Sequence, residues 1–207
     1  MFTLKTGERV LKAIESSPFG IAPLDVLESL RLSDSFTLKT TLSRLNKSGR
    51  IIRLKRGVYS ANPICDAFAC AQALFNGYLG FAAALHLHKL ITEIPFTLVV
   101  VTASTSKIRT MGSFEFKAIA LREKAVGFER LGDYVVSTRA KTLFDCLYLP
   151  EYSVEEEKLF NAFAQAKLSK KEWGEFEFYA KKFASGKKRE KMLDAEKIIK
   201  RITRGDG

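Results

Sequence analysis

The sequence predicts an α+β protein: an amino-terminal winged helix-turn-helix, then a mixed α/β domain with a helical carboxy-terminal tail. Three observations predict this order. Residues 6–48 hold three segments in which apolar residues recur at helical spacing, and the pattern of a short β-hairpin follows them. Residues 97–137 hold three runs typical of strands, and helical spacing returns after residue 153. We therefore expect three regions, which are residues 1–61, 62–152 and 153–207.

Length and composition are those of a globular protein. The chain has 207 residues, of which 46% are hydrophobic and 28% charged, so it is long enough to bury a core. Its three cysteines form no CxxC pair and are expected to be free thiols in a reducing compartment. No apolar stretch has the length of a membrane span or the pattern of a secretory signal. We therefore expect a cytoplasmic protein that does not interact with membranes.

Positive charge gathers at both ends of the chain. The formal net charge of +11 divides into +6 for residues 1–60, −1 for residues 61–165 and +6 for residues 166–207. Basic regions of this kind favour polyanionic partners, nucleic acid first.

Two short helices are expected to open the first region. Val10, Leu11 and Ile14 have helical spacing within residues 6–17, and the segment "SSPFG" ends that helix. The segment "IAPLDVLESL" is expected to begin the second helix, with Pro23 in its first turn.

The third helix is expected from Ser35 to Ser48. Leu38, Leu42 and Leu45 form one apolar stripe along it, and the glycine that follows Ser48 suits the position just past a helix end.

The opposite face of this third helix is polar and basic. At 100° per residue it presents Thr40, Ser43 and Lys47, flanked by Lys39 and Arg44, and it carries no carboxylate. Such a face suits a helix in the major groove of DNA, because short polar side chains reach base edges while cations contact phosphates.

A basic hairpin is expected directly after the third helix. The runs "RIIRL" and "VYS" have strand character and are joined by "KRG", where Gly57 supplies the turn. Arg53 lies in the first strand, and Lys55 and Arg56 lie at the tip. Between residues 36 and 60 there are seven basic residues and no acidic one. Three helices followed by a hairpin is the order of a winged helix-turn-helix, in which the wing reaches the phosphate backbone or a minor groove.

We therefore predict that residues 1–61 bind double-stranded DNA and that the protein regulates transcription as a sequence-specific repressor. The expected DNA contacts are Lys39, Thr40, Ser43, Arg44, Lys47, Arg53, Lys55 and Arg56. The alternative is a winged-helix interaction module that docks a toxin or other partner without specific DNA binding. A homodimer would suit two half-sites, although the sequence shows no obvious dimer seam.

The second and third regions are expected to form one α+β body with helices at its end. The strands are "FTLVVVTAS", "FEFKAIAL" and "DYVVST" in a mixed or antiparallel sheet, and helices are expected over residues 62–77, 78–90 and 138–149. The tail adds helices with six aromatic residues that are interpreted as core: Phe160, Phe163, Trp173, Phe176, Tyr179 and Phe183. Two interpretations of its lysines in "KKFASGKKREK" stay open: a solvated face, or a second nucleic-acid or partner contact.

No motif in the sequence predicts catalysis. His86 and His88 are two residues apart, so they cannot both face one metal from a helix. Arg139 and Asp145 look most like catalytic residues, but a nuclease needs several convergent carboxylates, and Asp145 is more simply a structural partner of a basic group or of backbone amides. We therefore expect no enzyme, no catalytic or metal-ligating residue and no cofactor. A metal-dependent nuclease is the least favoured alternative.

Three blocks of the sequence resemble AbiEi-type antitoxins, winged-helix transcriptional regulators of type IV toxin–antitoxin systems in bacteria and archaea. The block "LSRLNKSGRIIRLKRGVYS" resembles their recognition helix and wing, and "YLGFAAALHLHKLITEIPFTLVVVT" looks like the segment that follows there. "STRAKTLFDCLYLPEY" is similar to their "EKTL.D.L..P" segment, where the matching residues are Lys141, Thr142, Leu143, Asp145, Leu147 and Pro150. Ala140 departs from the glutamate that is usual in the family.

The resemblance implies a function in two parts. A winged-helix repressor domain would bind repeats in the protein's own promoter, and a second domain would have antitoxin activity. The resemblance also implies that the cognate toxin is similar to a nucleotidyltransferase, and that the antitoxin need not bind it tightly.

Overall fold

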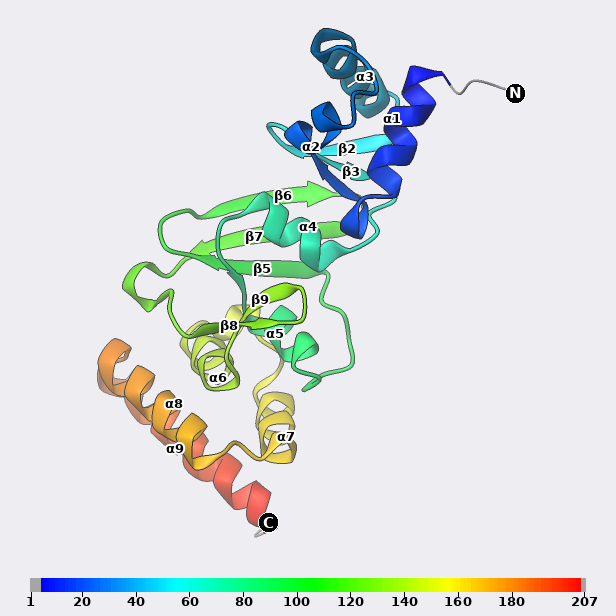
Figure 1. Cartoon of the computed structure of the whole chain (residues 1–207). Helices are drawn as coiled ribbons and strands as arrows, with labels where there is room; N and C mark the ends of the chain where they lie inside the picture. Colours follow the sequence, from blue (N-terminus) through cyan, green and yellow to red (C-terminus); the bar gives the residue numbers. More distant parts are fainter. Residues whose placement is uncertain (1–4, 206–207) are drawn as a thin grey trace. The chain divides into compact units, whose positions relative to one another are not determined.

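The computed structural model describes residues 5–205, so the first four residues of the amino-terminal segment lie outside it (Figure 1). The structure is mixed α+β, as predicted. It divides into two compact units: a smaller one of residues up to 74 together with 110–114, and a larger one of residues 75–109 with those from 115 onwards. The helical tail groups with the larger unit. The expected three-region division stays a prediction.

The smaller unit contains four α-helices, a 3-10 helix at Pro18–Gly20 and a three-stranded antiparallel sheet of order β1-β3-β2 among its described residues. In chain order the elements are α1 (Thr6–Glu15), β1 (Ile21–Pro23), α2 (Leu24–Ser29), α3 (Ser35–Lys47), β2 (Ile51–Lys55), β3 (Val58–Ala61) and α4 (Ala67–Leu74). This order agrees with the expected helices and hairpin.

The start of the second helix was predicted wrongly. It begins at Leu24 with Pro23 as its N-cap, not within the preceding residues. Those residues form β1 instead, with Ile21 opposite Ser60 and Pro23 opposite Val58. The physical reason is the proline ring, which disfavours helical backbone at Ala22 and leaves that residue free to pair as a strand.

Helix α3 has a clear start, end and buried stripe. Asp34 Oδ1 accepts a hydrogen bond from the Thr37 backbone N–H at 2.9 Å, which caps the first turn. The helix ends before Gly49, whose φ of +70° is the left-handed conformation common there. The predicted stripe of Leu38, Leu42 and Leu45 is buried and packs with residues of α1 and α2.

The larger unit is built on a six-stranded mixed sheet of order β6-β7-β5-β4-β9-β8, of which residues 110–111 and 114 group with the smaller unit. Its elements are β4 (Tyr78–Leu79), α5 (Phe81–Leu87), β5 (Thr97–Thr102), β6 (Lys107–Met111), β7 (Phe114–Ala120), β8 (Phe128–Leu131), β9 (Tyr134–Ser137), α6 (Arg139–Tyr148), α7 (Glu156–Ala166), α8 (Lys170–Phe183) and α9 (Gly186–Arg204). Strands β5 and β7 are parallel, as are β4 and β9, whereas β4–β5 and β8–β9 are antiparallel. The expected mixed sheet and its three predicted strands are confirmed.

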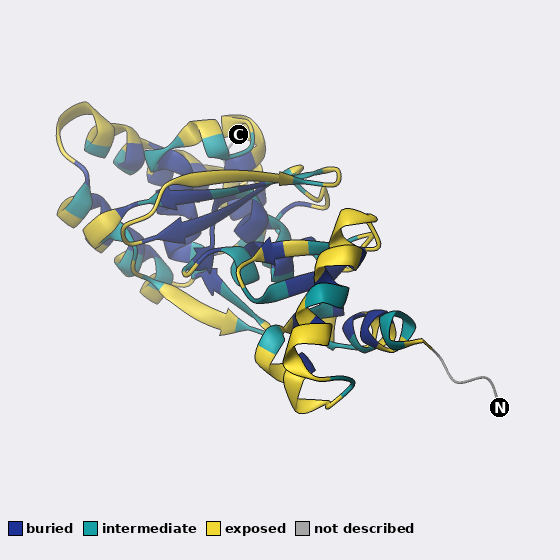
Figure 2. Cartoon of the chain, turned by 90° about the horizontal axis from the view of Figure 1, so that it is seen from above, coloured by how far each residue is buried: buried dark blue, intermediate teal, exposed yellow. Residues whose placement is uncertain are grey.

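Helix α6 lies at the centre of the larger core. Residues 140–147 are all buried, and α6 packs against α5 and α8. The tail supplies Trp173, Phe176 and Tyr179 to the same core, together with Phe160 and Phe163, and the partly buried Phe183 packs against it. The interpretation of these six residues as core is therefore confirmed. Figure 2 shows burial concentrated in the central strands and the inner faces of the helices. Among residues 5–205, no helix has both the length and the apolar character that crossing a membrane requires.

Candidate functional site

The predicted polar face of α3 is exposed except for Thr40, which is half-buried, and it is slightly hollowed. Phe36, Thr40, Ser43 and Lys47 follow one another at spacings of three or four residues, so they form one stripe along the helix. A hollow of about 380 Å³ lies over this stripe. It is lined by Phe36, Lys39, Thr40, Ser43, Arg44 and Lys47. All five α3 residues predicted to contact DNA therefore share one surface.

A second hollow lies between α3 and the β2–β3 hairpin and has a volume of about 540 Å³. Its lining is Leu24, Lys39, Leu42, Ser43, Asn46, Arg53, Arg56, Gly57 and Tyr59. Lys39 and Ser43 line both hollows, so α3 and the hairpin present one continuous surface. Seven of the eight predicted residues line it. Lys55 is exposed at the end of β2 but lines neither hollow.

Two hydrogen bonds, one to a side chain and one within the backbone, fix the hairpin to the helices. Asn46 Oδ1 accepts a hydrogen bond from the Arg53 backbone N–H at 2.8 Å, which joins α3 to β2. The Leu24 N–H donates to the Gly57 carbonyl at 2.7 Å, and Gly57 has the positive φ that the tight turn requires. Sequence reasoning missed Asn46, although its place three residues after Ser43 put it beside the polar face.

Five of the predicted cations have no ion-pair partner among residues 5–205. They are Arg44, Lys47, Arg53, Lys55 and Arg56, all of them exposed. Lys39 differs, because its Nζ lies 3.5 Å from Glu28 Oε1, which also accepts a hydrogen bond from Ser35 Oγ at 2.8 Å. The expectation of a face without carboxylates is therefore correct along α3 and the hairpin but misses the acid that α2 brings to one edge.

Arg50, the remaining cation of the basic stretch, belongs to a different surface. Its guanidinium donates to both carboxylate oxygens of Glu8 on α1, at 2.6 and 3.3 Å. This contact holds the pKa of Glu8 below its ordinary value. Arg50 therefore neutralises an acid of its own unit.

The two residues that most resembled catalytic groups have structural partners. Lys141 Nζ donates to Asp145 Oδ1 one turn away on α6, and both side chains are fully buried. Asp145 is therefore the structural partner of a basic group, as predicted. The Arg139 guanidinium donates to Glu172 of α8 at 2.7 and 2.8 Å.

The Lys141 ammonium is surrounded by aromatic rings. The centroids of Phe144, Tyr78 and Tyr179 lie 5.1, 5.8 and 6.0 Å from Nζ. Burial lowers the pKa of Lys141 and raises that of Asp145 to about 6. Asp145 Oδ2 has no hydrogen-bond partner among the described residues. This pair sits in the core as a structural element and not at an open surface.

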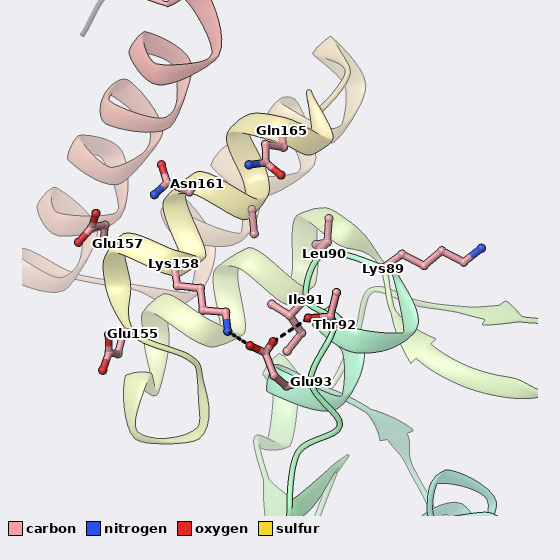
Figure 3. A pocket seen from close by; sticks show the side chains of 11 residues that line it. Lys89, Leu90, Ile91, Thr92, Glu93, Glu155, Glu157, Lys158, Asn161 and Gln165 are labelled. Atoms are coloured by element: carbon pink, nitrogen blue, oxygen red, sulfur yellow. Dashed lines mark hydrogen bonds and ion pairs between the residues drawn. The ribbon is translucent and has the colours of Figure 1, made fainter.

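The larger unit has an open hollow of about 490 Å³ between α7 and the loop before β5 (Figure 3). Glu93 joins its two sides, accepting hydrogen bonds from Lys158 at 2.5 Å and Thr92 at 3.4 Å. Figure 3 shows Asn161 and Gln165 along the α7 side. Its lining mixes acids, amides and lysines that are mostly exposed, and none of the predicted site residues belongs to it.

His88 is hydrogen-bonded within the larger unit, and the described residues form no cluster suited to a metal ion. The His88 ring Nε2 lies 2.7 Å from the Ser137 carbonyl oxygen, and burial lowers the pKa of His88. Within residues 5–205, no group of three or more His, Cys, Asp or Glu side chains is placed to hold a metal ion.

Lysines of the tail lie over aromatic rings at the junction of α8 and α9. Lys188 Nζ is 4.0 Å from the Tyr148 ring centroid, and Lys182 Nζ is 5.2 Å from that of Phe178. These contacts are compatible with both interpretations of the tail lysines.

A scan of the sequence against models of known protein families finds no match, and a search of curated proteins finds none either. The resemblance to AbiEi-type antitoxins therefore stays an expectation from the quoted residues.

Proposed function

We propose that this protein is a DNA-binding transcriptional regulator whose smaller unit is a winged helix-turn-helix. The observation that carries the proposal is the continuous basic surface formed by α3 and the β2–β3 hairpin, which seven predicted contact residues line. Helix α3 is the recognition helix and the hairpin is the wing. The order of helices and strands from α1 to β3 supports this assignment.

Each part of the surface has a chemical role. Thr40 and Ser43 offer hydroxyls that donate to or accept from base edges, and Lys47 extends the same stripe. Lys39, Arg44, Arg53 and Lys55 contact phosphates, and so does Arg56 at the hairpin tip. Five of the cations have no ion-pair partner among the described residues. They can therefore pair with DNA phosphates without first breaking an ion pair within the protein.

We further propose, from the resemblance alone, that the protein represses its own promoter as an antitoxin and that a nucleotidyltransferase-like toxin is its functional partner. The structure explains the matching residues of α6 in physical terms, because residues 140–147 are core. That pattern therefore maintains the larger unit and does not by itself identify a toxin-binding surface.

The proposal is tested by titrating the full chain against its own upstream DNA and against random DNA of equal length over a salt series. A preference of about a hundredfold or more for the upstream DNA is expected. The Arg53→Gln/Arg56→Gln variant should flatten the slope of log affinity against log salt by about 1.8, since each lost phosphate contact removes about 0.9. Lys170→Gln/Lys171→Gln, which removes two exposed cations from α8, is the matched control.

Two results would overturn the proposal. Equal affinity for both DNAs would mean a non-specific basic protein, and no binding would assign the smaller unit to a protein partner. An equal change of slope in the control would remove the hairpin from the interface. The stoichiometry from the same titration shows whether two copies occupy one site.

A further inference from the structure

Phe36 is an exposed aromatic residue on a surface that is otherwise polar and cationic. Its side chain is 80% exposed, although the hydrophobic effect favours burial of a phenylalanine ring. It is the second residue of α3, and the buried stripe of that helix consists of leucines on the other face. The core of the smaller unit does not include it. Packing within the protein therefore does not account for its presence.

The surroundings of Phe36 restrict what could cover it. Phe36 lines the hollow of about 380 Å³ over α3 together with Thr40, Ser43 and the cations Lys39, Arg44 and Lys47. Lys39 and Thr40 are about one turn from Phe36 along the helix, and Lys47 is about three turns away. Three cations on the same surface as an apolar group favour a ligand that is a polyanion and carries an apolar group of its own. A purely apolar protein surface would have to desolvate those cations without pairing them.

The major groove of DNA presents one such group. The C5 methyl of thymine projects into the groove between phosphate backbones, and apolar side chains contact it. Resting on the proposed function, we infer that Phe36 makes this smaller unit a reader of thymine methyl groups. Its ring, together with the Thr40 methyl, contacts the C5 position of a pyrimidine while the cations bind the flanking phosphates.

The test uses the full chain and a DNA site selected by it from a random pool. Each thymine is replaced singly by uracil, which removes the methyl group and leaves base pairing intact. At one or two positions, uracil is expected to weaken binding about fourfold, the value of one buried methyl-sized group. Replacing the same thymines by 5-bromouracil, whose halogen has the size of a methyl group, should restore affinity.

The variant Phe36→Ala should lose most of the discrimination between thymine and uracil sites, because only the Thr40 methyl still contacts the C5 position, and Phe36→Leu should retain a larger part of it. Phe96→Ala is the matched control, since Phe96 is 81% exposed and lies in the larger unit. It should keep the fourfold ratio. For each protein, the affinity for the thymine site is divided by the affinity for the uracil site at the same salt concentration. A change in phosphate contacts alters both affinities equally and leaves this ratio unchanged.

The outcomes separate this inference from the proposed function. If no DNA site can be selected, both are overturned. If a site is selected but uracil is neutral at every position, or if Phe36→Ala keeps the fourfold ratio, the inference alone is overturned. A concentration-dependent dimer that Phe36→Ala abolishes and Phe96→Ala does not would assign the ring to a second copy of the chain and also overturn it.

Discussion

The buried pair of Lys141 and Asp145 predicts that two single variants respond to pH in opposite directions. Lys141→Met leaves the Asp145 carboxyl alone in a fully buried site, where it is expected to keep a proton. Its ordinary pKa is 3.8, so holding that proton in the folded state at pH 7 costs about 4 kcal/mol, at about 1.4 kcal/mol for each pH unit. Asp145→Leu leaves Lys141 alone and neutral, which costs about 5 kcal/mol at pH 7 from an ordinary pKa of 10.5.

The signs follow from which state holds the proton. In Lys141→Met the folded state binds a proton that the unfolded state releases, so the free energy of unfolding falls as pH rises above about 4. In Asp145→Leu the unfolded state binds the extra proton, so the free energy of unfolding rises with pH up to about 10. Changing pH from 7 to 5 should therefore stabilise the first variant and destabilise the second, each by about 3 kcal/mol.

Trp173 makes the assay specific for the larger unit. It is the single tryptophan of the chain and lies in the same core as the pair, so its fluorescence during urea unfolding reports on that unit. The double variant Lys141→Met/Asp145→Leu should recover most of the stability, since an apolar pair replaces two buried charges. Lys181→Met, which removes an exposed partner 3.5 Å from Glu177, is the control and should cost less than about 1 kcal/mol. Costs below about 1 kcal/mol in both single variants, or pH responses of the same sign, would refute the reasoning.

Three other predictions concern single positions. Gly77→Ala places a Cβ 2.0 Å from the Val101 carbonyl oxygen and should cost more than about 2 kcal/mol by the same urea assay, whereas Gly174→Ala in open space on α8 should be neutral or stabilising. Asp34→Ala should lower the thermal midpoint by a few degrees, measured by circular dichroism, because α3 loses its cap. Since hydrogen bonds from Thr37 lower the pKa of Asp34, the cap is present above the ordinary pKa and lost as pH falls through the lowered one, and Asp34→Asn should remove this acid sensitivity. Glu28→Gln should raise DNA affinity in a titration, because it removes the carboxylate beside Lys39; an unchanged affinity would exclude Lys39 from the interface.

Local signals in the sequence predicted helix α3 almost to the residue. Its leucine spacing and the glycine after its end lie within one short segment, so no distant partner was needed, and the structure adds Asp34 as its cap. Helix α6 was predicted over residues 138–149 and spans Arg139–Tyr148, with Thr138 as its cap in the structure. In these two helices the spacing of apolar residues and the residue types at the helix ends indicate the same bounds.

The unpredicted strands depend on partners elsewhere in the chain. β1 has three residues and exists because β3 pairs with it across more than thirty residues. β6 and β8 are mostly exposed, so they show neither an apolar run nor the alternation of a half-buried strand. In the candidate site, the residues on α3 and the hairpin could be predicted because they share one segment. Glu28 could not, because only the packing of α2 brings it to Lys39.

Helix α3 has two separate stripes of residues. One packs in the core of the smaller unit, and the other faces outward, where a ligand could bind. Leu38, Leu42 and Leu45 hold the helix in place, while Thr40 and Ser43 take no part in the core. Substitutions on the outer stripe can therefore accumulate with little loss of stability. A few such changes would alter the chemistry of the outer face, while the Asn46–Arg53 hydrogen bond still joins the helix to the hairpin.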